Sequence, residues 1–251
     1  MDQKSLLKEL LFYLFLLLIL SNTNLALGEG IVRNTIFSDR EKYHYHAVPS
    51  GEKIDQPKEF IEIEVFGSSG GLEYMEKVSS SESIETISIK MNKEGRFISG
   101  LRHVSNQQNE RVSEERIWMD EKKVYVKRDL ERASRLNQID IPTDKTVAVN
   151  GSLLILLRSF PFKSDEKWNI LMVDFSGYSI PVAVHQSGIE NIIVPAGKFE
   201  CYRVQVVVGL PIIKPTLIYW LTTDEPHFLV KNIGKRGPFT SAYVTSLVSK
   251  E

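Results

Sequence analysis

The sequence predicts a mainly β protein: a single large curved antiparallel sheet, an incomplete barrel, wrapped around one short helix near residues 151–160. Three observations lead to this fold class. Apolar and polar residues alternate along most of the chain, which is typical of half-buried strands. One segment in the middle follows the helical period instead. Strand-like runs stand on both sides of that segment, so we expect one sheet that curves around the helix.

The first half of the chain is expected to form consecutive strands. The pattern is clearest in residues 59–66, where Ile61, Ile63 and Val65 share one face and glutamates occupy the other. Comparable runs lie at residues 43–48, 72–78, 83–91 and 97–104. Alternation of this kind indicates half-buried strands.

A hairpin and a long connection follow these strands. Residues 117–119 and 124–126 flank the polar segment 120–123, which predicts a hairpin turn. The polar residues 130–144 are expected to form a connection that leads to the helix. Acidic dipeptides at residues 114–115 and 224–225 are expected in turns. Neighbouring residues of a strand point to opposite faces, so neither dipeptide forms a paired-carboxylate site.

The helical segment covers residues 149–160. Leu153, Leu157 and Phe160 recur at helical spacing, and Pro161 ends the run. The segment is apolar enough to be mostly buried, and a buried strand is the alternative. Two residues are candidate N-caps: Asn150 and Ser152.

The rest of the chain returns to alternation and again predicts strands. They are expected at residues 168–175, 178–185, 189–194, 199–208, 217–222, 228–233 and 239–248. Cys201 lies in one of them and is the chain's single cysteine, which excludes an intramolecular disulfide. By alternation it shares a face with Phe199 and Arg203. A lone cysteine in a strand is usually a small buried hydrophobe, and a reactive thiol is the alternative.

The first 28 residues have the features of a signal peptide. Lys4 and Lys8 precede an apolar run at residues 10–20, and the small residues Ala26 and Gly28 suit a cleavage site. We therefore expect a periplasmic or cell-envelope protein in which residues 29–251 form one β domain. An uncleaved anchor is the alternative, and through it alone we expect contact with a membrane. The formal net charge of −1 gives no electrostatic case for binding nucleic acid.

Two motifs with catalytic or metal-binding potential are weak. Ser69 stands in a Gly-x-Ser-x-Gly run, but a nucleophile elbow needs a helix after it, and residues 72–78 favour a strand. A serine hydrolase is thus a distant alternative. His44 and His46 share one strand face and could chelate a metal, yet no third ligand has a recognisable spacing. We predict no metal, no cofactor and no catalytic residues.

Three segments together resemble a known family. They are Leu156-Leu-Arg158-Ser-Phe160, Val194-Pro-Ala-Gly197-Lys-Phe199 and Tyr219-Trp220-Leu-Thr-Thr-Asp224. In this order they resemble the exported bacterial family of domains of unknown function numbered 3108, which is related to the TapB-like proteins. That family is similar in fold to the lipoprotein carriers LolA and LolB, so the resemblance implies a curved, incomplete barrel with an apolar hollow closed by helical segments. It also implies structural roles for Arg158, Gly197, Phe199, Trp220 and Asp224.

These observations favour a non-enzymatic envelope protein that binds an apolar or lipid-like ligand in the concave face of its sheet. The residues expected to line that site are Leu153, Leu157, Phe160 and Trp220. The alternative is a structural or assembly protein of the envelope that acts on a protein partner. An open hollow beside the helix would favour ligand binding, and a filled hollow would favour the assembly role.

Overall fold

Alternation of apolar and polar residues produces a run of antiparallel strands in this protein. The computed structural model describes residues 40–53, 55–68, 70–130, 133–142, 145–162, 165–210, 214–235 and 241–251. Within them lie 15 strands of one sheet and the helix α2 (Ser152–Arg158). The strands are β1 (Arg40–Pro49), β2 (Glu59–Ser68), β3 (Gly71–Ser80), β4 (Ser83–Met91), β5 (Phe97–Asn106), β6 (Arg111–Asp120), β7 (Lys123–Leu130), β8 (Ala133–Asp140), β9 (Thr146–Val149), β10 (Lys167–Val173), β11 (Ser179–Val194), β12 (Gly197–Val208), β13 (Thr216–Thr222), β14 (Leu229–Lys235) and β15 (Ala242–Lys250).

The strand order joins two meanders at β1. The order is β8 back to β1, followed by β15 back to β9, so β1 pairs with both β2 and β15. All neighbouring strands are antiparallel except β9 and β10, which are parallel. As a result β8 and β9, which follow each other in the chain, occupy the two outer edges of the sheet. The sheet is therefore unclosed, and the predicted fold class is confirmed.

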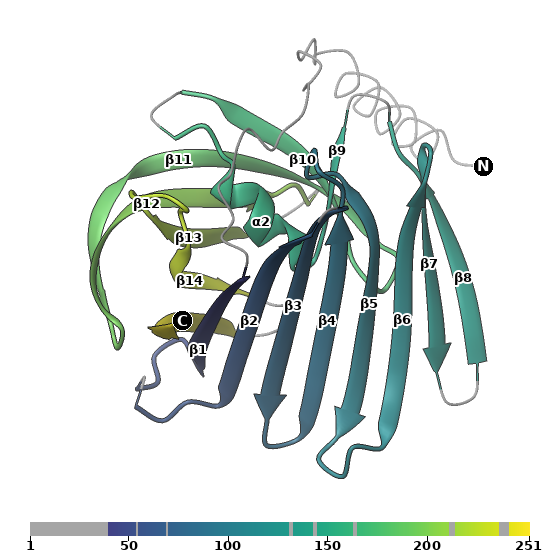
Figure 1. Ribbon diagram of the computed structural model, residues 1–251, viewed down its shortest axis with the longest axis horizontal. Coiled ribbons are helices and arrows are strands. Elements are labelled where there is room, and N and C mark those ends of the chain that lie inside the picture. The colour runs from purple at the N-terminus through teal and green to yellow at the C-terminus, as the bar shows by residue number, and fades with distance from the viewer. Residues whose placement is uncertain are drawn as a thin grey trace, which may run out of the picture.

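Curvature brings the two meanders face to face. Figure 1 shows β2–β8 side by side in front, β11–β14 curving behind them, and α2 in the space between. Inward-facing residues of the front strands, such as Ile63, Val65 and Ile89, are buried, as is Leu157 of α2. The core thus lies on the concave face of the sheet, which is the face that curves around α2.

Three elements differ from the sequence-based expectation. The polar segment expected as a connection contains the edge strand β8, and the residues just before the helix form β9. The two strands expected between residues 178 and 194 are one strand, β11, which continues through an irregularity between Gln186 and Gly188. A bulge adds one residue to a strand without ending it. Here it interrupts the apolar alternation, and this interruption led to the prediction of two strands instead of one.

The helix begins at a glycine rather than at either predicted N-cap. Gly151 is the N-cap with a φ of 90°, and a Cβ there would lie 2.8 Å from a ring carbon of Tyr74. The Ser152 hydroxyl instead donates to the carbonyl of Val149 at 2.9 Å and accepts from its amide at 2.7 Å. The positive φ and the close approach of the Tyr74 ring both require glycine at this position. Glycine has no side chain, so the helix lacks a side-chain N-cap.

A turn from the second meander covers the concave side of the first meander at one point, near the edge strand β8. Phe175, in the turn between β10 and β11, is buried against Gly100 of β5, where a Cβ would lie 3.2 Å from its ring. Asn137 of β8 donates from Nδ2 to the carbonyl of Ser176 in the same turn at 3.5 Å. The second meander thereby reaches back to the first without closing the barrel.

Candidate functional site: the concave face and its charged margin

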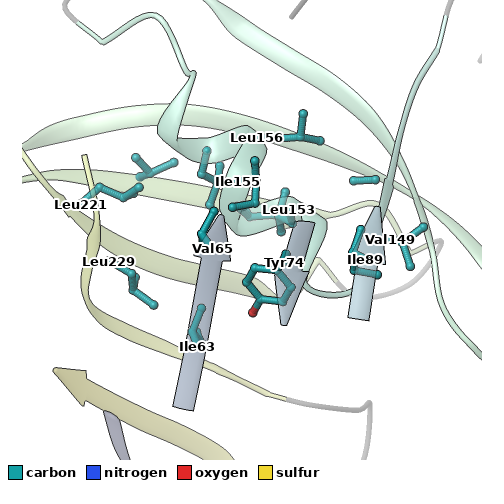
Figure 2. Packing of buried hydrophobic residues seen from close by; sticks show 14 of the residues in the cluster. Ile63, Val65, Tyr74, Ile89, Val149, Leu153, Ile155, Leu156, Leu221 and Leu229 are labelled. Carbon is teal, nitrogen blue, oxygen red and sulfur yellow. The ribbon is translucent and has the colours of Figure 1, made fainter. Parts of the chain in front are cut away.

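The three helix-segment residues expected to line a ligand site all point into the core. Leu153, Leu157 and Phe160 are 6%, 0% and 3% exposed. Figure 2 shows Leu153, Ile155 and Leu156 among the inward side chains of strands from both meanders. Burial on every side of α2 means that the helix occupies the concavity and does not line one wall of it.

Little space remains beside α2. The cavity there has a volume of about 10 Å³. It is lined by Tyr43, Tyr45, Ile63, Val65, Leu154, Ile155, Arg158, Phe228 and Leu229. Such a volume is comparable with one water molecule, whereas pockets for small ligands measure hundreds of cubic ångströms. The concave face around α2 is thus a filled core.

A buried ion pair anchors the end of α2. Arg158 donates from Nη1 to Glu41 Oε2 at 2.8 Å, and both side chains are almost fully buried. Its Nε donates to the carbonyl of Pro226 at 2.8 Å. Tyr43 donates to the same Glu41 oxygen at 2.7 Å, and burial raises the pKa of Tyr43 well above its usual value. Arg158 therefore connects α2 to β1 and to the loop before β14, which agrees with a structural role.

Trp220 lies on the opposite face of the sheet from α2, contrary to the prediction. Its partner across β12 is Arg203, while the next residue, Leu221, pairs with Tyr202 on the helix side. Trp220 Nε1 donates to Glu190 Oε2 at 2.8 Å, and Lys231 Nζ lies 5.5 Å from the ring centre. Side chains alternate between faces along a strand, so Trp220 cannot line the space around α2.

The remaining family-like positions lie near the turn of the β11–β12 hairpin and in the loop before β14. Gly197 has a φ of 133° where β12 begins. The rings of Phe199 and Phe228 meet edge to face at 5.7 Å. Asp224 is exposed, and its carbonyl accepts hydrogen bonds from Thr222 Oγ1 and the amide of His227. These contacts are those of turns and packing.

A charged ladder crosses the concave face beyond the helix. Arg102 donates from Nε and Nη2 to the two carboxylate oxygens of Glu85, each at 2.9 Å, and from Nη1 to Glu115 at 3.3 Å. Glu115 is 1% exposed and lies mid-strand in β6, which corrects the expectation of a turn. Its register partners are Arg102 on β5 and Arg128 on β7. The concave face is thus apolar under α2 and ionic toward β8.

The ladder ends in two arginines. Arg128 on β7 is the register partner of Arg135 on β8. Arg128 Nε is buried without a hydrogen-bond acceptor, and Glu115 Oε1 lies 3.9 Å from it. Like charges that face each other across strands oppose pairing. The sequence carried a signal for Glu115 and Arg128, because the predicted hairpin at residues 120–123 places them opposite each other.

The other residues considered for chemistry are not brought into one site. Ser69 lies outside the described residues, and β3 rather than a helix begins at Gly71. Cys201 is fully buried, and burial raises the pKa of its thiol to about 12. His44 and His46 point outward beside a groove of about 190 Å³ near Phe60. Among the described residues no group of three His, Cys, Asp or Glu side chains could hold a metal.

Comparison with known proteins adds little beyond distant structural likenesses. No protein-family model matches the chain, and no curated protein matches it. One similar solved structure is "a putative lipoprotein" from Parabacteroides distasonis, with 10% identity, 85% of this chain and 96% of that chain covered, and a TM-score of 0.36. Another is "a putative exported protein with YmcC-like fold" from Bacteroides fragilis, with 9% identity, 84% and 95% covered, and a TM-score of 0.32. Both scores are too low to carry an inference about this chain.

The helix content bears on membrane contact in one respect. In the part of the chain that the structure describes, α2 is a seven-residue helix, and no helix has the length and hydropathy needed to cross a bilayer. The predicted leader at residues 1–28 lies outside the described residues. Its cleavage or retention therefore stays a prediction from the sequence.

Proposed function

We propose that this protein is a non-enzymatic protein of the bacterial cell envelope that acts through contacts with another protein. The observation that carries the proposal is the filled concave face. The cavity found beside α2 among the described residues measures about 10 Å³, far below the volume that an apolar ligand needs. The concave face serves as the core, so the surfaces left for function are the outer face, the loops and the edges of the sheet.

Three further observations support the envelope and non-enzymatic parts of the proposal. The apolar run at residues 10–20, after two lysines and before small residues, is typical of an export signal. The Gly-x-Ser-x-Gly run at residues 67–71 connects two paired strands, β2 and β3, and a nucleophile elbow requires a following helix. The thiol of Cys201 is protonated and enclosed, which is unsuited to nucleophilic attack.

Binding of an apolar ligand is the second candidate function. It is favoured by the apolar character of the space that α2 fills, and by the lack of a side-chain hydrogen bond at the N-cap of this short helix. A ligand would have to displace Leu153, Leu157 and Phe160 from the core. Displacement must also separate Arg158 from Glu41, so the ligand has to compensate for a buried ion pair.

In-cell photo-cross-linking and native mass spectrometry separate the two functions. A cross-linker replaces Met75 or Leu136, which are 47% and 62% exposed, and Leu157, which is buried, as the control. The proposal predicts discrete protein adducts from an exposed position, none from residue 157, and a purified protein of the mass of the mature chain alone. A co-purifying hydrophobic molecule without any protein adduct would overturn the proposal in favour of ligand binding.

A further inference from the structure

The two edges of the sheet differ in how they are covered. At the β9 edge, Ala148 and Val149 are fully buried, and α2 follows directly in the chain. At the other edge, residues 134–138 of β8 are exposed on both faces of the strand. Figure 1 shows β8 at the right-hand margin of the sheet. Within the described residues β8 pairs with β7 alone, so β8 is the open edge.

In the part of the chain that the structure describes, the outward backbone groups of β8 have no strand partner along this edge. The amide of Ile141, just after β8, donates to the carbonyl of Lys122 on the β7 side at 2.8 Å. Backbone groups of successive residues point to opposite sides of a strand. The amides and carbonyls of Ser134, Leu136 and Gln138 therefore point away from β7. Such a row is a template for an added strand.

Among the described residues, the charged ladder on the concave face ends in two arginines and not in an acid. One register line runs Arg102, Glu115, Arg128 and Arg135 from β5 to β8, so the sign alternates until the edge and then repeats. Arg135 makes no ion pair with any described residue, and Arg128 Nε lacks an acceptor. A carboxylate beyond Arg135 would restore the alternation and compensate for the two adjacent guanidinium groups.

We propose that β8 accepts an extended segment of a partner protein as an added strand, and that this segment carries a carboxylate opposite Arg135. An aliphatic residue next to the carboxylate would lie beside Leu136, which is 62% exposed on the other face. This inference rests on the proposed function, because it specifies where the partner binds and which chemistry recognises it. Affinity comes from main-chain hydrogen bonds, and specificity from the charge opposite Arg135.

A second copy of β8 does not meet this requirement. Among the described side chains of β8, those on the concave side are Arg135, Asn137 and Ile139. This set contains no acid, so a β8–β8 pair cannot supply the missing carboxylate. The electrostatic pattern therefore favours a different, acidic segment over self-association.

The test uses two labelled strand-length peptides of alternating threonine and valine, with either glutamate or glutamine at the centre. Fluorescence anisotropy with the mature protein at low salt should show that the glutamate peptide binds about two- to fivefold more tightly. Arg135→Gln should remove this difference. Arg116→Gln is the matched control, because Arg116 is an exposed arginine that pairs with Glu114 on β6. Added salt should reduce the preference for glutamate.

A second pair of variants tests the added strand itself. Gln138→Pro removes an outward amide, while Gln138→Thr keeps it, and circular dichroism checks that both fold. Both peptides should bind the proline variant several-fold more weakly than the threonine variant. Failure of the glutamate peptide to bind, or equal binding of both peptides, would overturn the inference. A third outcome would also overturn it: added acetate abolishes the preference for glutamate, and Gln138→Pro does not weaken binding of either peptide. That result would indicate a simple anion site and not an added strand.

The two proposals fail in distinguishable ways. Protein adducts from residue 75 in cells, together with peptides that do not bind β8, would leave the proposed function standing and remove the edge as its site. Absence of adducts from both exposed positions together with unbound peptides would remove both.

Discussion

The ion pair between Arg158 and Glu41 is buried on both sides, which makes it sensitive to the loss of either partner. The guanidinium of Arg158 contacts two separate parts of the sheet: Glu41 on β1 and the carbonyl of Pro226 in the loop before β14. Taking both charges out of water is costly, and the cost is offset only while the pair and its hydrogen bonds are complete. Arg158 thus fixes α2 in the core more than it adds net stability.

Replacing one partner should be much worse than replacing both. We expect Arg158→Ala to lower the free energy of unfolding by about 3–5 kcal/mol, because it leaves a buried carboxylate without its counter-charge. The double variant Arg158→Met with Glu41→Leu should recover most of this loss. Urea denaturation near neutral pH measures both. A single variant that loses less than about 1 kcal/mol, like an exposed pair, would contradict the structural role.

Tyrosines in the core make the fold sensitive to alkali. Burial, with Glu76 as the second cause, raises the pKa of Tyr219 from 10.0 to about 12. The pKa in the folded state is above that of the unfolded state, so the stabilisation is complete below pH 10 and is lost as the pH rises toward 12. Burial raises the pKa of Tyr45 and Tyr74 in the same direction.

The free energy of unfolding should therefore fall with rising pH over that window, and Tyr219→Phe should make the fall less steep. Denaturant titrations at several alkaline pH values measure the slope, and tyrosinate absorbance reports ionisation. Tyr178→Phe is the control, since Tyr178 is 70% exposed. If the slope in Tyr219→Phe were unchanged, ionisation of Tyr219 would not contribute to the pH dependence of the free energy of unfolding.

At the scale of elements, α2 acts as a core element rather than as a surface helix. Its residues Ile155, Leu156 and Leu157 are at most 1% exposed, although they point in different directions around the helix. A helix that is apolar all round must be buried on all sides, and both meanders supply that cover. Two short stretches of backbone connect α2 to β9 and β10, so its position depends on packing.

Truncation inside α2 should be costly for this reason. We expect Leu157→Ala to lower the free energy of unfolding by about 2–5 kcal/mol, because the tightly packed surroundings cannot collapse into the space. Met75→Ala, at an outer-face position, should change it by less than about 0.5 kcal/mol. Thermal and urea unfolding compare the two variants. Equal effects at both positions would mean that α2 is not part of the cooperative core.

The prediction of elements succeeded where one physical rule acts alone. Strands such as β2 and β4 have one buried and one exposed face, so alternation predicted them directly. β8 was missed, because a polar edge strand is exposed on both faces and has no apolar alternation. The helix N-cap was wrong, because the ring of Tyr74, distant in the sequence, demands glycine at Gly151. The predicted hairpin was sufficient to pair Glu115 with Arg128. The position of Arg135 beside Arg128 could not be predicted, because β8 was not recognised as a strand.

At the scale of the whole molecule, β1 makes the two meanders into one sheet. It pairs along its length with β2 on one side and with β15 on the other. Inward residues of both meanders then share a continuous core around α2. Neither half can bury its concave face alone, so the described structure favours a single cooperative unit.

The three tryptophans allow a direct test of this cooperativity. Trp118 lies on β6 in one meander, while Trp168 and Trp220 lie on β10 and β13 in the other. Variants that keep one tryptophan each, with phenylalanine at the other two positions, should unfold in urea with coincident fluorescence transitions after correction for their stability. A transition reported by Trp118 that is distinct from the other two would show that the meanders unfold separately.

The sequence by itself determined the class of this fold, because period-two and helical patterns are local consequences of which side chains avoid water. It placed the central helix and most strands, and it predicted an export signal. The tertiary structure alone decided whether the hollow is filled, which face Trp220 occupies and which edge stays open. Those properties depend on curvature and on the register between strands far apart in the chain, and no local pattern encodes them.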